Sequence, residues 1–143
     1  MDSINIVEIR KGHIPEYKHL TDACCDLRAS VESPVVIPPK DIVTIPLGFA
    51  IELPFGYQGK IKPRSGLAKR EKVFTINGTV DEGYTGEVCA IMCNLSDKPY
   101  TVHDGDRICQ MEICEYQQFD FNVVSKLAET ERGSNGFGST GLC

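Results

Sequence analysis

The sequence predicts an all-β domain with a sandwich or barrel-like fold, and three observations support that prediction. Short runs rich in β-branched residues follow one another along the chain and are separated by glycine, proline or aspartate clusters. Eight prolines are spread between Pro15 and Pro99, which disfavours long helices in that part of the chain. The 143 residues are 41% hydrophobic and 24% charged, values that fit one globular domain with its own core.

The expected strands share apolar alternation or β-branched composition, and they are residues 4–9, 35–37, 42–45, 49–53, 58–62, 87–95, 100–102 and 107–115. One short helix is expected to begin near Ser65, with that hydroxyl as its N-cap, and to run to Arg70. Residues 128–143 are polar and carry four glycines, so they bury too little apolar surface to offset their own ordering entropy. We therefore predict a β core over residues 1–127 and a flexible glycine-rich C-terminal arm over residues 128–143.

The charge balance excludes some partners, and the cysteines indicate a compartment. Fifteen lysines and arginines against twenty acidic residues give a formal net charge of -5, which disfavours a general nucleic-acid surface. No apolar stretch approaches the ~20 residues of a membrane span, and the first residues lack the apolar core of a secretory signal. The seven cysteines are odd in number and form no CxxC pair. We expect a protein of a reducing compartment, cytoplasmic, or nuclear in a eukaryotic or infected cell, and not secreted.

The segment PRSGLA (63–68) joins an expected strand to the short helix and is a candidate anion site. Arg64 offers a forked cation, Ser65 a hydroxyl, and Gly66 lets a ligand approach the backbone closely. Proline, serine and glycine also build ordinary turns, so this segment alone leaves the choice between a turn and a phosphate site open.

The segment NGTVDEGYTG (77–86) has residues suited to reading a base and activating a water. Gly78 has no side chain, so a planar base could lie against its backbone, and Asp81 is a candidate general base acting on water. A turn aspartate that bonds its own backbone is the alternative for Asp81. Tyr84 is either a core residue or a flat surface against a sugar ring.

Two further positions can contact a ligand. In GDRICQ (105–110), Gln110 is polar within an apolar strand and needs a partner if buried, and a ligand phosphate would serve. Arg107 of the same segment is interpreted as a structural ion-pair partner. Phe137 lies between two glycines of the arm, which places a flat apolar side chain on a backbone able to approach a ligand closely.

Five segments of the chain, taken in order, resemble the five motifs of the trimeric dUTP diphosphatase (dUTPase) family. They are ACCDLRA (23–29), PRSGLA (63–68), GTVDEGYTG (78–86), GDRICQ (105–110) and RGSNGFGSTG (132–141). The resemblance implies a jelly-roll-like homotrimer that hydrolyses dUTP to dUMP and pyrophosphate, with Mg2+ bound mainly by the triphosphate. It also implies that each active site is shared among three subunits. Such an enzyme limits uracil in DNA and supplies dUMP for thymidylate synthesis.

The resemblance also implies roles for individual residues. Asp81 would position and activate the water that attacks the α-phosphorus, and Asp26 would orient magnesium-bound water. Arg64 and Gln110 would bind the phosphate chain, and Ser65 would bond near the α,β-bridging oxygen. The full set of implied substrate contacts is Arg64, Ser65, Gly66, Asn77, Gly78, Tyr84, Gln110, Arg132, Phe137, Gly138 and Ser139.

The same resemblance gives the arm the role of a lid. Tyr84 would pack against deoxyribose and exclude a 2'-hydroxyl, Arg132 would hold the γ-phosphate, and Phe137 would close over uracil. The expected partners are therefore dUTP and two further copies of the chain, without nucleic acid or membrane.

Two positions depart from the family pattern. Cys24 stands where the first motif usually has glycine, and Thr75 stands where some relatives carry an asparagine that reads uracil, the asparagine here being Asn77. Two other functions stay open. One is a dCTP deaminase-like enzyme of the same fold, which needs a glutamate to activate water at the pyrimidine ring, and the other is a nucleotide- or protein-binding module without catalysis. The presence of Asp81 in the diphosphatase form of the motif favours the hydrolase.

Overall fold

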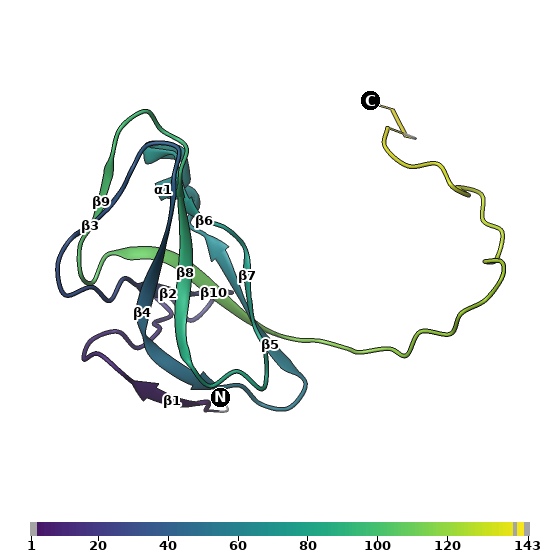
Figure 1. The fold of residues 1–143 in the computed structure, drawn as a ribbon. Coiled ribbons are helices and arrows are strands. Elements are labelled where there is room, and N and C mark those ends of the chain that lie inside the picture. The colour runs from purple at the N-terminus through teal and green to yellow at the C-terminus, as the bar shows by residue number, and fades with distance from the viewer. Residues whose placement is uncertain (1–2, 139, 142–143) are drawn as a thin grey trace.

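The structure, a computed structural model that describes residues 3–138 and 140–141, is an all-β sandwich with one short helix (Figure 1). One sheet contains, in order, β1 (Asn5–Glu8), β4 (Ile42–Glu52), β8 (Glu87–Asn94) and β6 (Val73–Thr75). The second sheet contains, in order, β2 (Cys25–Arg28), β10 (Arg107–Glu115), β5 (Tyr57–Pro63) and β7 (Gly78–Val80). A two-stranded ribbon pairs β3 (Val35–Ile37) with β9 (Tyr100–Val102), and helix α1 (Ser65–Glu71) follows β5. The predicted fold class is confirmed.

The two four-stranded sheets enclose the core between their inner faces. Strand β8 illustrates the cause, since Val88, Ala90 and Met92 are buried whereas the residues between them are exposed. Phe49 of β4 and Met111 of β10 are fully buried and come from opposite sheets. Burial of these apolar side chains supplies the main favourable free energy of folding and fixes the loops at the sheet ends.

The structure corrects three details of the predicted elements. Strands β2, β6 and β7 lie outside the predicted strands, because each is only three or four residues long and is defined by its partner strand. Strand β4 is one strand of 11 residues where the sequence predicts two, with a register shift between Pro46 and Ala50. Helix α1 is confirmed, but the N-cap is Arg64 and no side chain caps it. The predicted Ser65 cap is wrong, because Ser65 already lies within the first helical turn.

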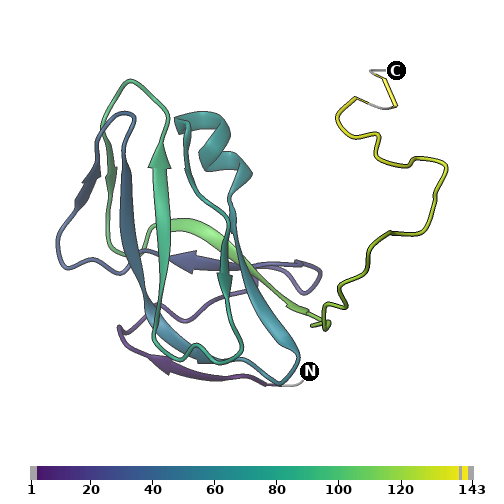
Figure 2. The ribbon, with the colours of Figure 1, turned by 45° about the vertical axis from the view of Figure 1, so that its right-hand side comes forward.

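After β10 the chain leaves the sandwich and does not return to it. Residues 117–138 are exposed and form neither helix nor strand, and Figures 1 and 2 show them extending away from the sheets. Strand β10 ends at Glu115. The boundary at residue 128 between the β core and the arm stays a prediction. Among the described residues, no helix is long and apolar enough to cross a membrane.

Replacing Gly48 by alanine should destabilise the fold, because this residue has a positive φ and no space for a side chain. Its φ is 76°, and an added Cβ would lie 2.8 Å from His13 Cβ and 3.0 Å from Ser30 Cβ. Left-handed strain and overpacking each cost ~1–3 kcal/mol, so Gly48→Ala should lower the free energy of unfolding in urea by about 2–6 kcal/mol. Gly12→Ala is the matched control, since Gly12 also has a positive φ, 86°, but open space around its Cβ. Equal effects of the two changes would contradict this packing explanation.

Candidate active site

A polar cavity, which we call the arginine cavity, lies at the β2 end of the second sheet. It has a volume of about 310 Å3 and is lined by Lys18, Asp22, Ala23, Cys24, Asp26, Arg64, Arg107 and Gln110. These residues come from β2, from β10, from the N-cap of α1 and from the segment before β2. Three cations and two carboxylates line the cavity, which suits a ligand with several negative charges.

Asp26 holds the two arginines of this cavity in place. The Asp26 carboxylate lies 3.3 Å from Arg64 Nε through Oδ1 and 3.1 Å from Arg107 Nη1 through Oδ2. Arg64 Nη1 also donates to the Arg107 carbonyl at 2.8 Å. The interpretation of Arg107 as a structural ion-pair partner is confirmed. The network fixes the Arg64 guanidinium before any ligand binds.

Gln110, Ser65 and Gly66 lie close to this ion-pair network. Gln110 pairs with Asp26 across β10 and β2, and its Nε2 donates to the Pro63 carbonyl at 2.8 Å. This half-buried amide therefore has a partner within the chain, as its position in an apolar strand requires. Ser65 and Gly66 are exposed at the start of α1, and a Cβ at Gly66 would come no closer than 3.6 Å to its neighbours. Packing within the chain therefore does not require glycine at position 66. A ligand that approaches the backbone closely would require it, because a side chain there would be in the way.

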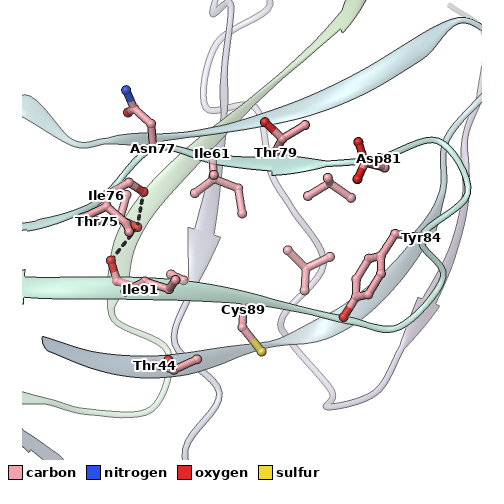
Figure 3. A pocket seen from close by; sticks show the side chains of 14 residues that line it. Thr44, Ile61, Thr75, Ile76, Asn77, Thr79, Asp81, Tyr84, Cys89 and Ile91 are labelled. Carbon is pink, nitrogen blue, oxygen red and sulfur yellow. Dashed lines mark hydrogen bonds between the residues drawn. The ribbon is translucent and has the colours of Figure 1, made fainter.

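A second cavity, which we call the carboxylate cavity, lies between β7 and β8 and has a volume of about 330 Å3 (Figure 3). Its lining residues are Thr44, Ile61, Thr75, Ile76, Asn77, Gly78, Thr79, Val80, Asp81, Tyr84, Val88, Cys89, Ala90 and Ile91. Asp81 and Tyr84 lie at one end, and Thr75 and Asn77 lie at the other (Figure 3). Largely apolar walls with a few polar groups at the ends suit a flat organic ring.

Asp81 directly follows β7, and its side chain is exposed. Within the described part of the chain its carboxylate accepts no hydrogen bond, and the turn is closed instead by its backbone carbonyl, which accepts from the Tyr84 amide at 3.0 Å. The side chain is thus not used by the turn and can bind water. Tyr84 is 46% exposed, and its hydroxyl donates to the Glu87 carbonyl at 2.8 Å, so it is a fixed flat surface and not a core residue.

Thr75 and Asn77 differ in what they can offer a ligand. Thr75 is 1% exposed, and its hydroxyl is directed at the carbonyls of Ile76 and Ile91, at 3.0 and 3.1 Å. Asn77 is exposed, and its amide points away from β8 in Figure 3. At Gly78 an added Cβ would have ordinary contact at 3.6 Å, so packing does not require this glycine. The backbone near Gly78 is therefore the available group for reading a base, because the Thr75 hydroxyl is already used.

A single chain does not bring the predicted site residues to one place. The two cavities share no lining residue, and they lie toward opposite edges of the second sheet, whose order is β2-β10-β5-β7. On the arm, Arg132 Nε donates to the Asn135 carbonyl at 2.9 Å, and Phe137 is fully exposed. Gly138 follows Phe137 on the arm, and Ser139 lies outside the described residues.

Lys18 and Asp22 line the arginine cavity although no sequence pattern indicates them. They precede β2 and reach the cavity because Glu16 forms an isolated bridge with Asp26, with backbone hydrogen bonds of 3.3 and 2.8 Å. This pairing, together with the Arg28 Nη2–Glu16 Oε2 ion pair at 3.4 Å, ties the segment that carries them to β2. To predict them from the sequence, one would have to know that Glu16 pairs with Asp26, ten positions further along the chain.

The carboxylates of the arginine cavity do not form a metal site by themselves. The part of the chain that the structure describes contains no group of three His, Cys, Asp or Glu side chains that could hold a metal ion. Both oxygens of Asp26 face arginines. Carboxylate oxygens of this kind can accept hydrogen bonds from water on a cation that arrives with a phosphate ligand.

Two thiols lie buried behind the arginine cavity. Cys25 Sγ donates to the Met111 carbonyl at 3.3 Å, and burial raises the pKa of Cys25 to about 11. Burial raises the pKa of Cys109 to about 12. Burial also raises the pKa of Cys24, which lines the cavity, although Lys62 acts in the opposite direction. These thiols are therefore protonated at neutral pH and weak nucleophiles.

An all-β fold with an arginine-lined cavity and a largely apolar cavity beside a carboxylate fits the class of nucleotide hydrolases. The dUTPase family model matches residues 10–141. The deoxyuridine 5'-triphosphate nucleotidohydrolase of Orientia tsutsugamushi strain Boryong is 44% identical over 131 residues, covering 90% of this chain and 88% of the relative. The enzyme of strain Ikeda is 43% identical over 131 residues, which again cover 90% of this chain and 88% of the relative. The chain belongs to the dUTPase family.

Solved structures agree on the fold. A mutant dUTPase of Staphylococcus bacteriophage 80alpha with dUpNHpp has a TM-score of 0.90 at 24% identity, covering 99% of this chain and 100% of that one. The dUTPase of S. aureus phage phi11 has a TM-score of 0.81 at 20% identity, covering 90% and 100%. At this identity the likeness supports the jelly-roll fold alone.

Thiol labelling should leave Cys25 and Cys109 unmodified in the folded protein. The thiolate is the reacting form, and at about pH 8 both groups are buried thiols with raised pKa values. Iodoacetamide treatment followed by peptide mass spectrometry should find these two residues unlabelled before unfolding in urea and labelled after it. Labelling of either residue in the folded protein as fast as in the unfolded chain would contradict their protection.

Proposed function

We propose that this chain hydrolyses dUTP to dUMP and pyrophosphate, with Asp81 activating the water that attacks the α-phosphorus. The observation that carries the proposal is the exposed Asp81 carboxylate, which stands without a hydrogen-bond partner among the described residues at the end of the carboxylate cavity. A general base must keep its carboxylate available to water, and typically contributes ~10²–10⁴-fold to the rate. Membership of the dUTPase family supports the choice of substrate.

The arginine cavity would bind the triphosphate. Arg64 and Gln110 line it, and Ser65 and Gly66 follow Arg64 directly, so these four residues offer a cation, an amide, a hydroxyl and open backbone. Attack on a phosphoanhydride needs alignment and charge neutralisation more than it needs a covalent nucleophile. The ion pairs of Asp26 support this role, because they orient the arginines in advance.

Mg2+ is the proposed cofactor. When bound, it would neutralise charge on the triphosphate, and Asp26 would accept hydrogen bonds from its water. The donor set fits a cation carried by the nucleotide, since the described residues hold no metal cluster of their own. A mutant dUTPase of S. aureus phage phi11 coordinates a structural Mg(II) ion, so a protein of this fold can accommodate the metal.

A homotrimer is the proposed assembly. The arginine cavity and the carboxylate cavity lie apart in one chain, so a complete site needs the carboxylate cavity of a second copy against the arginine cavity of the first. The arm of a third copy would then bring Arg132, Phe137, Gly138 and Ser139. Tyr84 would pack against deoxyribose, and the backbone at Asn77 and Gly78 would read uracil.

We further propose that the enzyme acts in the cytoplasm, or in the nucleus of a eukaryotic or infected cell, and needs neither nucleic acid nor membrane. Its role there would be to limit uracil in DNA and to supply dUMP. The dCTP deaminase-like alternative is not favoured, because the matching family and the curated relatives are dUTPases. Nothing in the two cavities favours a binding module without catalysis.

The purified chain should release pyrophosphate from dUTP with Mg2+ and should not hydrolyse dTTP, dCTP or UTP.

The Asp81→Asn variant should still bind dUTP, but its kcat should fall by about 10²–10⁴-fold, because the change removes the base and leaves the cavity walls intact. Pyrophosphate release, an ammonia assay with dCTP and a light-scattering mass are the measurements. Ammonia without pyrophosphate, a monomer with full activity, or a near-wild-type kcat for Asp81→Asn would each refute the corresponding step.

A further inference from the structure

The loop that carries Asp81 has few attachments to the rest of the fold. It comprises residues 81–86, between β7 and β8, and all of its residues except Glu82 are exposed. The hydrogen bond from the Tyr84 amide to the Asp81 carbonyl stays inside the loop, and that from the Tyr84 hydroxyl reaches only Glu87 at the start of β8. Such local bonds shape the turn but do not fix its position against the sandwich.

Glu82 supplies the side-chain link between this loop and distant parts of the chain. Its Oε2 accepts a hydrogen bond from the Gly56 amide at 2.8 Å and another from the Tyr116 hydroxyl at 2.7 Å. Gly56 lies between β4 and β5, and Tyr116 is the first residue after β10. In the described part of the chain, no other side chain of residues 81–86 bonds outside the loop and its flanking strand.

Three backbone segments therefore meet at one carboxylate. The Tyr116 amide also donates to the Gly56 carbonyl at 2.9 Å, which closes a triangle between the loop, the β4–β5 turn and the end of β10. The bond from Tyr116, followed by that from Gly56, lowers the pKa of Glu82, and the Glu82 bond raises the pKa of Tyr116. Both directions fit an ionised carboxylate that accepts from a neutral phenol, which is a strong type of hydrogen bond.

Glu82 is the residue next to Asp81, so their Cα atoms are ~3.8 Å apart. An anchor at Glu82 therefore limits where the Asp81 carboxylate can lie. A displacement of the general base by ~1 Å can cost on the order of 10²-fold in rate, because the attacking water must be aligned with the phosphorus. Loss of the anchor would act on the chemical step more than on binding, since most of the carboxylate cavity wall comes from the strands of the sandwich and from Ile76 and Asn77, and only Asp81 and Tyr84 of the lining belong to the loop.

We propose that Glu82 is a positioning residue, which holds the Asp81 loop in its reactive place through the Gly56 amide and the Tyr116 hydroxyl. The inference rests on the proposed dUTP hydrolysis. It also links the Asp81 loop to the point where the chain leaves the sandwich, because Tyr116 directly follows β10.

Three variants and one matched control test this role. Glu82→Ala removes both bonds, Glu82→Gln keeps an oxygen that can accept them, and Tyr116→Phe removes one hydroxyl only. Glu115→Ala is the control, because Glu115 accepts a hydrogen bond of the same type from the Tyr57 hydroxyl at 3.2 Å, and this bond joins β10 to β5 and not to the Asp81 loop. Steady-state kinetics with Mg2+ and dUTP give kcat and KM, and hydrogen exchange reports the protection of amides 81–86.

Glu82→Ala should lower kcat by about 10- to 100-fold with KM within about threefold of wild type. Glu82→Gln should restore kcat to within about threefold, and Tyr116→Phe should lower it by a smaller factor than Glu82→Ala. The kcat of the double variant Glu82→Ala with Tyr116→Phe should be no lower than that of Glu82→Ala alone, because the two residues share one hydrogen bond. Exchange of amides 81–86 should rise in Glu82→Ala and stay unchanged in Glu115→Ala.

An unchanged kcat and unchanged exchange in Glu82→Ala would overturn the inference, as would equal losses in Glu82→Ala and Glu115→Ala. If Glu82→Ala fails to fold, the Tyr116→Phe variant becomes the deciding test. A wild-type kcat for Tyr116→Phe would then overturn the positioning role of Glu82. A wild-type protein that does not cleave dUTP would refute the proposed function. In that case hydrogen exchange still shows whether Glu82 anchors the loop.

Discussion

The pairing of β10 with both β2 and β5 is the constraint on which the site depends. It sets Gln110 opposite Asp26 on one side and Lys62 on the other. Through this pairing Arg107 meets Asp26 although the two residues are 81 positions apart. β10 also ends next to the turn that precedes β5, where the Tyr116 amide bonds Gly56. One central strand thus locates the arginine cavity and the point where the chain leaves the sandwich.

Local charge, and not the net charge of the protein, determines which ligand the arginine cavity fits. The chain carries a formal charge of -5, yet three cations line the cavity beside two carboxylates. Asp26 is half-buried and bonds both arginines, so it reduces their freedom before a ligand arrives. Arginine forks fixed in this way lose less entropy when they bind phosphate, which is why an acidic residue inside an anion site is not a contradiction.

The predictable parts of the fold were those with local signals. β8 and β10 are long enough for their alternation and β-branched content to identify them, and α1 follows from a break in that pattern. β2 has the sequence CDLR, whose apolar-polar alternation matches its buried and half-buried residues, but a run of four residues is too short to identify a strand without its partner β10. The cap of α1 was predicted at Ser65 but lies at Arg64, because Arg64 retains extended backbone angles and interacts with Asp26. A one-residue difference of this kind depends on tertiary contacts.

Local periodicity was enough to predict the fold class, whereas side-chain chemistry together with the family resemblance predicted the motifs and the residue types of the candidate site. The sequence also allowed Arg107 to be interpreted as an ion-pair partner. The three-dimensional contacts were needed to show that Asp81 and Arg64 line separate cavities, that the Thr75 hydroxyl is already hydrogen-bonded, and that Glu82 joins three segments. The physical reason is that strand pairing and side-chain hydrogen bonds join residues far apart in the chain, and no local pattern specifies those partners.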